Sequence, residues 1–176
     1  LPGFLLAFAF CTSGFASFAS AEPVYNPEIL AGPEYNFRKT TWGMTREKVM
    51  STENKKPDDV GSVTIEGINF DYLTYFDIPF HKYTGQLVYL FHEGELVNID
   101  IHFFDHPKIG KELAPVCTSI WGQPTGDEYD KDNDVLYSYW ELNDTKILLI
   151  SYLTRSKSVK TPGDATLRIY RSLQNN

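Results

Sequence analysis

The feature that most constrains the fold is a stretch of alternating apolar and polar side chains within residues 86–104, QLVYLFHEGELVNIDIHFF. One side of an extended chain would carry Val97, Ile99, Ile101 and Phe103, and the other side would carry Asn98, Asp100 and His102. Because successive side chains of a strand point to opposite faces, this period of two predicts a strand with one buried face and one solvent face. Glu93-Gly94 predicts the two-residue loop of a hairpin.

Further strands are expected on both sides of this hairpin. Residues 60–104 are rich in β-branched and aromatic side chains, which favour strands. Three more runs of this kind occur near the C-terminal end, VLYSYWEL (135–142), KILLISYL (146–153) and TLRIYRSL (166–173). Asn143-Asp144 predicts the turn between the first two of these runs.

A short helix is expected after Trp42-Gly43. The hydroxyl of Thr45 is suited to accept a hydrogen bond from the first turn, and the negative charge of Glu47 suits the helix dipole. The helix should stop near Asn54, because Pro57 follows shortly after and restricts the residue before it. Each residue of this segment therefore has a structural purpose, and no pair resembles a catalytic acid and base.

A second helix is expected from apolar residues at helical spacing, which are Ile109, Leu113, Val116, Cys117 and Ile120. Pro115 lies within this pattern and costs about 3 kcal/mol in a regular helix interior. The helix should therefore be kinked at Pro115 or begin close to it. Trp121-Gly122-Gln123-Pro124 is typical of a helix end, with a glycine cap and a proline that prevents continuation.

The order of these segments is helix, strands, helix, strands. We therefore predict an α+β fold in which a helix is followed by an antiparallel β-meander. The arrangement is expected in tandem, as two αβββ-type units within one domain, with approximate boundaries at residues 38–104 and 105–176.

The segment Gly43-Met44-Thr45-Arg46-Glu47-Lys48-Val49 resembles the start of the helix in BamE-like (SmpA/OmlA) envelope proteins. The helix end of that family is matched by Gly122-Gln123-Pro124, which lies in the other half of this chain. A doubled helix-plus-meander unit also resembles the β-lactamase inhibitor protein. These resemblances imply a non-enzymatic envelope protein that works by contacting another protein, through its sheet face or its helix–sheet groove.

The first 21 residues differ from the rest of the chain. They contain no charged residue, and Ala19-Ser20-Ala21 is a small-x-small site before Glu22. This pattern is typical of a secretory signal peptide, so residues 22–176 are expected to form a single secreted or periplasmic domain. The apolar run spans about ten residues, which is shorter than the ~20 of a membrane-spanning helix. No membrane span is therefore expected after cleavage.

The formal net charge of −7 restricts the possible partners. An acidic chain without a basic cluster is not suited to nucleic acid or to anionic lipid. After cleavage, Cys117 would be the one remaining cysteine, so no internal disulfide can form. Its apolar neighbours predict a buried, unreactive thiol rather than a nucleophile.

An acidic run suggests a possible calcium site. Asp130, Asp132, Asp134 and Glu141 have the carboxylate spacing of an EF-hand loop. Val135 stands where that loop needs a glycine, and the residues after it alternate like a strand. The alternative is a solvated acidic loop that joins a helix to a strand.

Histidines offer a second possible metal site. Asp100 and His102 are expected on the same strand face, with His106 four residues further on. Two imidazoles and a carboxylate are ligands that zinc accepts. The alternative is one exposed histidine on a strand and one in a loop.

We therefore predict a non-enzymatic protein-interaction module whose partner is another envelope or secreted protein. The expected binding residues are Asn98, Asp100 and His102 on one strand and Tyr137 and Tyr139 on another. Tyrosines on an exposed face are typical interface residues. The alternatives are a calcium- or small-ligand-binding protein and, third, an enzyme of unrecognised type.

Overall fold

The computed structural model describes residues 37–104, 108–153 and 165–171 of the chain. The described elements follow one another in this order: α1 (Arg46–Thr52), β1 (Asp59–Ile65), β2 (Ile68–Phe80), β3 (Tyr83–His92), β4 (Glu95–Phe103), α2 (Ile109–Trp121), β5 (Gly126–Asp130), β6 (Val135–Leu142), β7 (Thr145–Tyr152) and β8 (Ala165–Arg171). The predicted signal peptide, its cleavage site and His106 lie outside these described residues.

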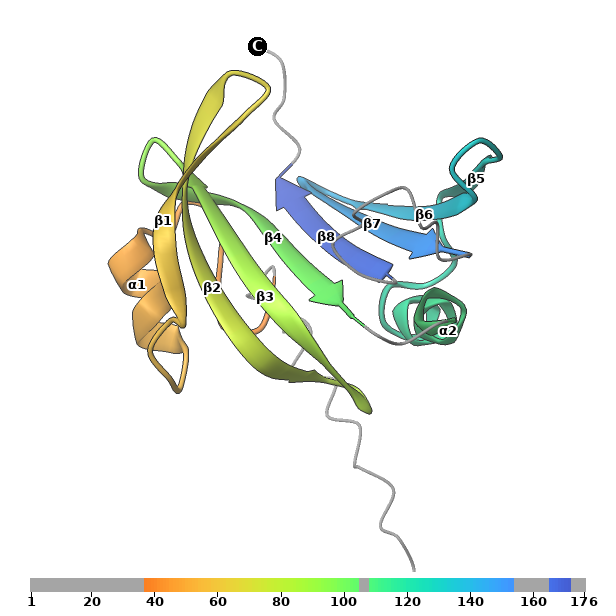
Figure 1. Ribbon diagram of the computed structural model, residues 1–176, viewed down its shortest axis with the longest axis horizontal. Helices are drawn as coiled ribbons and strands as arrows, with labels where there is room; N and C mark the ends of the chain where they lie inside the picture. The colour runs from red at the N-terminus through yellow and green to blue at the C-terminus, as the bar shows by residue number, and fades with distance from the viewer. Residues whose placement is uncertain (1–36, 105–107, 154–164, 172–176) are drawn as a thin grey trace, which may run out of the picture.

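All eight described strands form one antiparallel sheet in the order β1-β2-β3-β4-β8-β7-β6-β5. The prediction of two units with a helix and three strands each is therefore wrong. Four strands follow each helix, and the pairing of β4 with β8 joins them into a single open sheet (Figure 1). Residues 126–130, which lead into the acidic run for which a solvated loop was the alternative to a calcium site, form the edge strand β5. Its composition, GDEYD, lacks the apolar side chains by which strands are recognised.

Strand β4 shows the predicted alternation over most of its length. Ile99, Ile101 and Phe103 are fully buried on one face of the sheet. The exception is Val97, which we expected on the same face. The pairing register shifts at this point, because Leu90 pairs with Asn98 and the next residue of β3 pairs with Leu96. Val97 is thus the extra residue of a β-bulge.

Helix α1 begins as expected and ends slightly early. The hydroxyl of Thr45 accepts a hydrogen bond from the backbone N–H of Lys48, at 3.4 Å, and the last helical residue is Thr52. Gly43 has a φ of +82°, which glycine adopts without a steric penalty. This conformation lets the backbone N–H of Gly43 donate to the carbonyl of Leu96, at 3.1 Å. The approach to the helix is therefore fixed by pairing with β4.

Helix α2 runs through Pro115 without interruption, so it neither begins there nor stops there. It ends at Gly122, as predicted, with a φ of +82° at that glycine. Near its start the helix lies very close to β7. A Cβ on Gly110 would come within 2.3 Å of the Cβ of Ser151, so only glycine allows this close approach.

The core lies between the helices and one face of the sheet, which we call the helix face. It includes Val49 from α1 and Leu113 from α2, together with buried side chains from every strand between β2 and β8 except β5. Figure 1 shows α1 beside β1 and β2 and α2 beside β7 and β8. Within the described part of the chain, neither helix has the length and apolar character needed to cross a membrane.

Candidate binding groove

The opposite face of the sheet, which we call the groove face, carries the residues predicted to bind a partner. Strand pairing places five side chains in one row across the sheet, Tyr139, Leu148, Arg168, Asp100 and Val88. The adjacent row consists of Tyr137, Ile150, Thr166, His102 and Gln86. The two predicted sets of residues therefore share one face, and two strands separate them.

An ion pair lies at the centre of the groove face. The guanidinium of Arg168 donates two hydrogen bonds to the carboxylate of Asp100, from Nε at 2.8 Å and from Nη2 at 2.9 Å. The side chain of Asp100 is only 6% exposed, whereas that of Arg168 is 42% exposed. Such a two-pronged contact fixes the orientation of the guanidinium. Asp100 was expected at the surface, and the structure instead places it beneath Arg168 as a positioning residue.

His102 lies beside this ion pair and is largely buried. One ring nitrogen, Nδ1, lies 3.1 Å from the hydroxyl of Thr166. Burial lowers the pKa of His102 below its usual value, Asp100 opposes this shift, and Arg168 adds to it. Burial disfavours the charged imidazolium more than the carboxylate stabilises it. The neutral form of His102 is therefore favoured at neutral pH.

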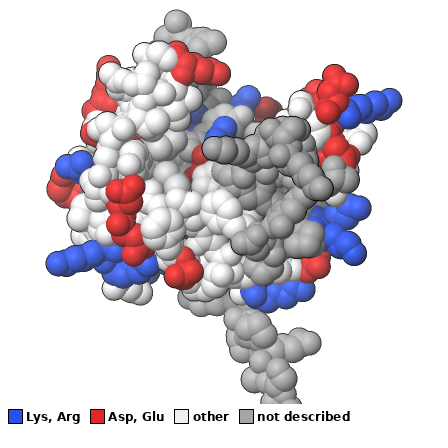
Figure 2. All heavy atoms as spheres, viewed as in Figure 1, with Lys and Arg blue, Asp and Glu red and all other residues white. Residues whose placement is uncertain are grey.

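A pocket of about 330 Å³, the central pocket, opens on the groove face next to Arg168. Its apolar lining includes Phe70, Leu90 and Leu148, and its polar lining includes Asn98 and Arg168. The lining residues come from β1, β2, β3, β4, β7 and β8, so the sheet itself forms the floor. Figure 2 shows Lys and Arg atoms between the part of the molecule formed by β1–β4 and the part formed by β5–β8.

A second pocket of about 840 Å³ adjoins the central pocket and is bordered by the β5–β6 hairpin. Tyr137 and Tyr139 line it, and Leu148 and Tyr170 line both pockets. Because they share these two side chains, the pockets lie next to each other, and we call the two together the groove. Tyr139 is 38% exposed, so its ring remains accessible to a partner.

Comparison with known proteins gives no information on what the groove binds. No protein-family model matches the sequence, and no curated protein matches it. Among solved structures, the chain is similar to the crystal structure of a DUF4309 family protein (YjgB) from Bacillus subtilis. The sequence identity is 9%, the match covers 82% of this chain and 89% of that chain, and the TM-score is 0.47. A likeness of this size supports no functional argument, so the function must be inferred from the groove.

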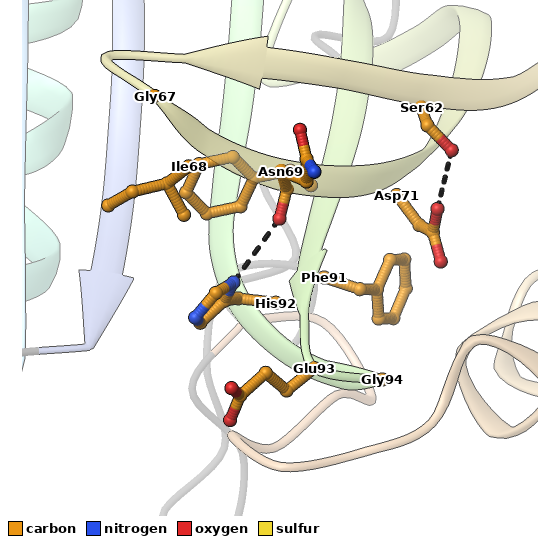
Figure 3. A pocket seen from close by; sticks show the side chains of 10 residues that line it. Ser62, Gly67, Ile68, Asn69, Asp71, Phe91, His92, Glu93 and Gly94 are labelled. Carbon is orange, nitrogen blue, oxygen red and sulfur yellow. Dashed lines mark hydrogen bonds between the residues drawn. The ribbon is translucent and has the colours of Figure 1, made fainter.

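A third pocket, of about 710 Å³, lies at the end of the β1–β2 and β3–β4 hairpins (Figure 3). Two pairs of its polar groups are already engaged with each other. His92 Nδ1 lies 3.2 Å from the carbonyl of Asn69, and the hydroxyl of Ser62 donates to Asp71 at 2.6 Å. Figure 3 shows both contacts on the wall of the pocket. These contacts fix the hairpin ends and leave fewer polar groups for a ligand.

The structure does not gather the carboxylates of the predicted calcium site. Asp130 Oδ1 accepts hydrogen bonds from the backbone N–H groups of Asp132 and Asn133, at 2.9 and 3.2 Å. Glu141 lies on β6, where it pairs with Lys146 at 3.1 Å. Asp130 therefore shapes the hairpin turn, as aspartate often does. Over the described ranges, no three His, Cys, Asp or Glu side chains are arranged to hold a metal ion. Calcium binding stays an untested prediction.

The remaining candidate residues, Cys117 and the suggested zinc ligands Asp100 and His102, are buried in the core or held by neighbouring side chains. Cys117 is fully buried within the core, and burial raises the pKa of its thiol to about 12. The thiolate is thus disfavoured at neutral pH. Of the suggested zinc ligands, Asp100 is engaged by Arg168 and His102 lies against Thr166.

Sequence reasoning missed the central residue of the groove, Arg168. Its strand was predicted, and the alternation in TLRIYRSL places Thr166, Arg168 and Tyr170 on one face. A charged residue in the middle of an apolar strand was the available signal. Its partner could not be found in this way, because Asp100 lies on a different strand, 68 residues away.

Proposed function

We propose that this chain is a non-enzymatic binding protein of the cell envelope that docks another protein in the groove. The single observation that carries the proposal is the groove of two adjoining pockets, in which tyrosine and leucine side chains lie beside an arginine fixed by a buried carboxylate. Tyrosine and arginine are the residue types that dominate binding energy at protein interfaces. An arginine that is already held in place loses less freedom on binding.

The proposal also covers the cellular location of the chain and its relationship to a protein family. The signal-peptide pattern of residues 1–21 supports a secreted or periplasmic location. The helix-start motif Gly43–Val49 supports a relationship to BamE-like envelope proteins. Both are arguments from sequence, and the partner we infer is another envelope or secreted protein.

Site-specific photo-crosslinking in the native host tests the proposal. A photoreactive side chain at Tyr139 is expected to capture one envelope protein, because Tyr139 borders the groove. Met50 on α1 is the matched control, since both side chains are 38% exposed. We expect Leu148→Glu to abolish the capture. We expect Tyr137→Ala to raise the dissociation constant for the partner by about tenfold or more, as for an interface hot spot. Equal capture from Tyr139 and Met50 would contradict the proposal.

The central pocket favours a second candidate function, the binding of a small amphipathic molecule. Its volume of about 330 Å³ lies within the usual range of ligand pockets, ~300–1,000 Å³. Apolar side chains line one part of it, and Asn98 and Arg168 could bind a polar end group. A thermal-shift screen with apolar carboxylic acids tests this function. The stabilisation should disappear in Leu148→Trp, which fills the pocket, and persist in Met50→Trp.

A further inference from the structure

The two edges of the sheet differ sharply in charge. Strands β1 and β5 each pair on one side within the described residues. Strand β5 has five residues, and three of them, Asp127, Glu128 and Asp130, carry carboxylates. Strand β1 has seven residues, and the segment 60–65 contains no ionisable side chain. Charged side chains protect edge strands against pairing with other chains, so β5 is protected and β1 is not.

Strand β1 is also accessible and regular. Val60, Val63 and Ile65 are 46%, 38% and 43% exposed, although each is apolar. The register with β2 runs without a bulge from the pair Asp59–Thr74 to the pair Ile65–Ile68. The strand contains no proline. Figure 2 shows mostly uncharged surface, bordered by Asp and Glu atoms, over the part of the molecule that contains β1, β2 and β3. Apart from Asp59, whose carboxylate accepts a hydrogen bond from the backbone N–H of Val60 at 2.9 Å, this edge strand carries no charge, no proline and no bulge.

We propose that β1 is a strand-addition site and that its occupant is the β1 strand of a second copy of this chain. The two strands run antiparallel about a twofold axis perpendicular to the sheet, and the two sheets continue into each other. This interface lies at the sheet edge and shares only Ile65 with the lining of the central pocket, so the inference does not depend on the proposed function of the groove.

A register centred on Val63 fits the charges of this pairing. With Val63 opposite Val63 of the second copy, Ser62 lies opposite Thr64 and Gly61 opposite Ile65. The charged residues at the ends then face uncharged positions, with Asp59 opposite Gly67 and Glu66 opposite Val60. Side chains directly opposite each other in an antiparallel pair are in contact, and β-branched pairs are favourable there. No like charges meet in this arrangement.

The choice of a second copy rests on self-complementarity. A twofold interface brings the same surface of both subunits together, so a patch of one charge repels itself. Strand β5 is excluded by its three carboxylates, whereas segment 60–65 of β1 carries no charge and meets the requirement. One strand pair buries less area than the ~1,200–2,000 Å² of a stable interface. The dimer is therefore expected to form and dissociate with concentration.

Analytical ultracentrifugation over a concentration series, with charge variants of Val63, tests the inference. The wild-type protein should be more than half dimeric at about 100 µM, a concentration suited to a small interface. Val63→Lys and Val63→Glu should each be monomeric, because like charges then meet on the twofold axis. An equimolar mixture of the two variants should regain the dimer, because opposite charges then meet. Val63→Thr, which keeps the β-branch without a charge, should remain dimeric.

The outcomes separate this inference from the proposed function. A wild-type protein that is monomeric at about 100 µM overturns the inference. The β1 edge would then be available for an extended segment of another protein. A dimer that survives Val63→Lys, or a mixture that stays monomeric, overturns the pairing of β1 with itself. The groove variant Leu148→Glu and the β5 variant Tyr129→Lys should leave the dimer unchanged. Loss of the dimer in Tyr129→Lys would assign it to the opposite edge of the sheet.

Discussion

Buried polar side chains of this protein differ in whether they have a hydrogen-bond partner. The side chain of Glu53 is 3% exposed and is bound by Arg38, with Nε–Oε1 and Nη2–Oε2 distances of 3.2 and 3.0 Å. Tyr89 also donates to this carboxylate, at 2.6 Å. The hydroxyl of Tyr75 is buried in the same region and has no hydrogen-bond partner among the residues that the structure describes. Burial raises the pKa of Tyr75 to about 12.

Two tyrosine-to-phenylalanine substitutions should therefore have opposite effects. Tyr75→Phe is expected to raise the free energy of unfolding by about 1 kcal/mol, because it removes a buried hydroxyl without a partner. Tyr89→Phe is expected to lower it by about 1.5–3 kcal/mol, because a hydrogen bond to a charged group is lost. Urea denaturation measures both values. A loss of stability in Tyr75→Phe would show that its hydroxyl is hydrogen-bonded in solution.

The buried position of His102 predicts a pH dependence of stability. Its folded-state pKa lies below that of the unfolded chain, so the unfolded state takes up the proton first as the pH falls. The stabilising contribution is complete above the unfolded pKa of about 6.5 and is lost as the pH falls through the folded pKa. Between about pH 7 and pH 5 the wild type should lose more stability than His102→Gln. Denaturation curves at several pH values measure this difference, and parallel curves would contradict it.

At the scale of elements, α2 contains the clearest conflict between local preference and tertiary structure. Pro115 lacks the N–H that would donate to the carbonyl of Lys111, yet the helix continues on both sides of it. The burial of Leu113 and Cys117 against the sheet stabilises the helix in spite of this loss. Helix formation in proteins depends mainly on such packing of an apolar face.

Replacing this proline should relieve the conflict. Pro115→Ala is expected to raise the free energy of unfolding by about 1–3 kcal/mol, since the missing hydrogen bond can form and the ring clash is removed. Pro115 is exposed, so no packing is lost. Ser119→Ala, at another exposed position of α2, serves as the control and should change stability by less than about 0.5 kcal/mol. A destabilised Pro115→Ala would show that the native backbone depends on the ring.

At the scale of the whole molecule, the pairing of β4 with β8 joins residues that lie far apart in the sequence. Ile101 pairs with Leu167, and both side chains are fully buried. Trp42 connects the same two parts of the chain, because its indole Nε1 donates to the hydroxyl of Thr145 at 2.9 Å. The two halves of the sheet thus share one core, and we expect them to unfold together.

Leu167→Ala tests this cooperativity. It should lower the free energy of unfolding by about 2–5 kcal/mol, because a buried cavity is created at the junction. Leu142→Ala, whose side chain is 38% exposed, should cost much less. Circular dichroism and tryptophan fluorescence should report a single shared transition in both variants. Two separate transitions would show that the halves are independent domains.

The candidate site could be predicted only in part. Asn98, Asp100, His102, Tyr137 and Tyr139 are assigned to faces by alternation along their own strands, which is a local property. The structure places all five on the groove face. The burial of Asp100 could not be predicted, because it depends on Arg168 from another strand. The pocket walls could not be predicted either, because they come from six strands at once.

The sequence by itself determined the local elements. The helix start at Thr45, the helix end at Gly122 and the faces of β4 follow from hydrogen bonding, glycine conformation and side-chain alternation, which act over a few residues. Only the tertiary structure decided that four strands follow each helix, that β4 joins β8 and that Arg168 meets Asp100. Such pairings depend on which distant strands complement each other, and a local pattern carries no information about that choice.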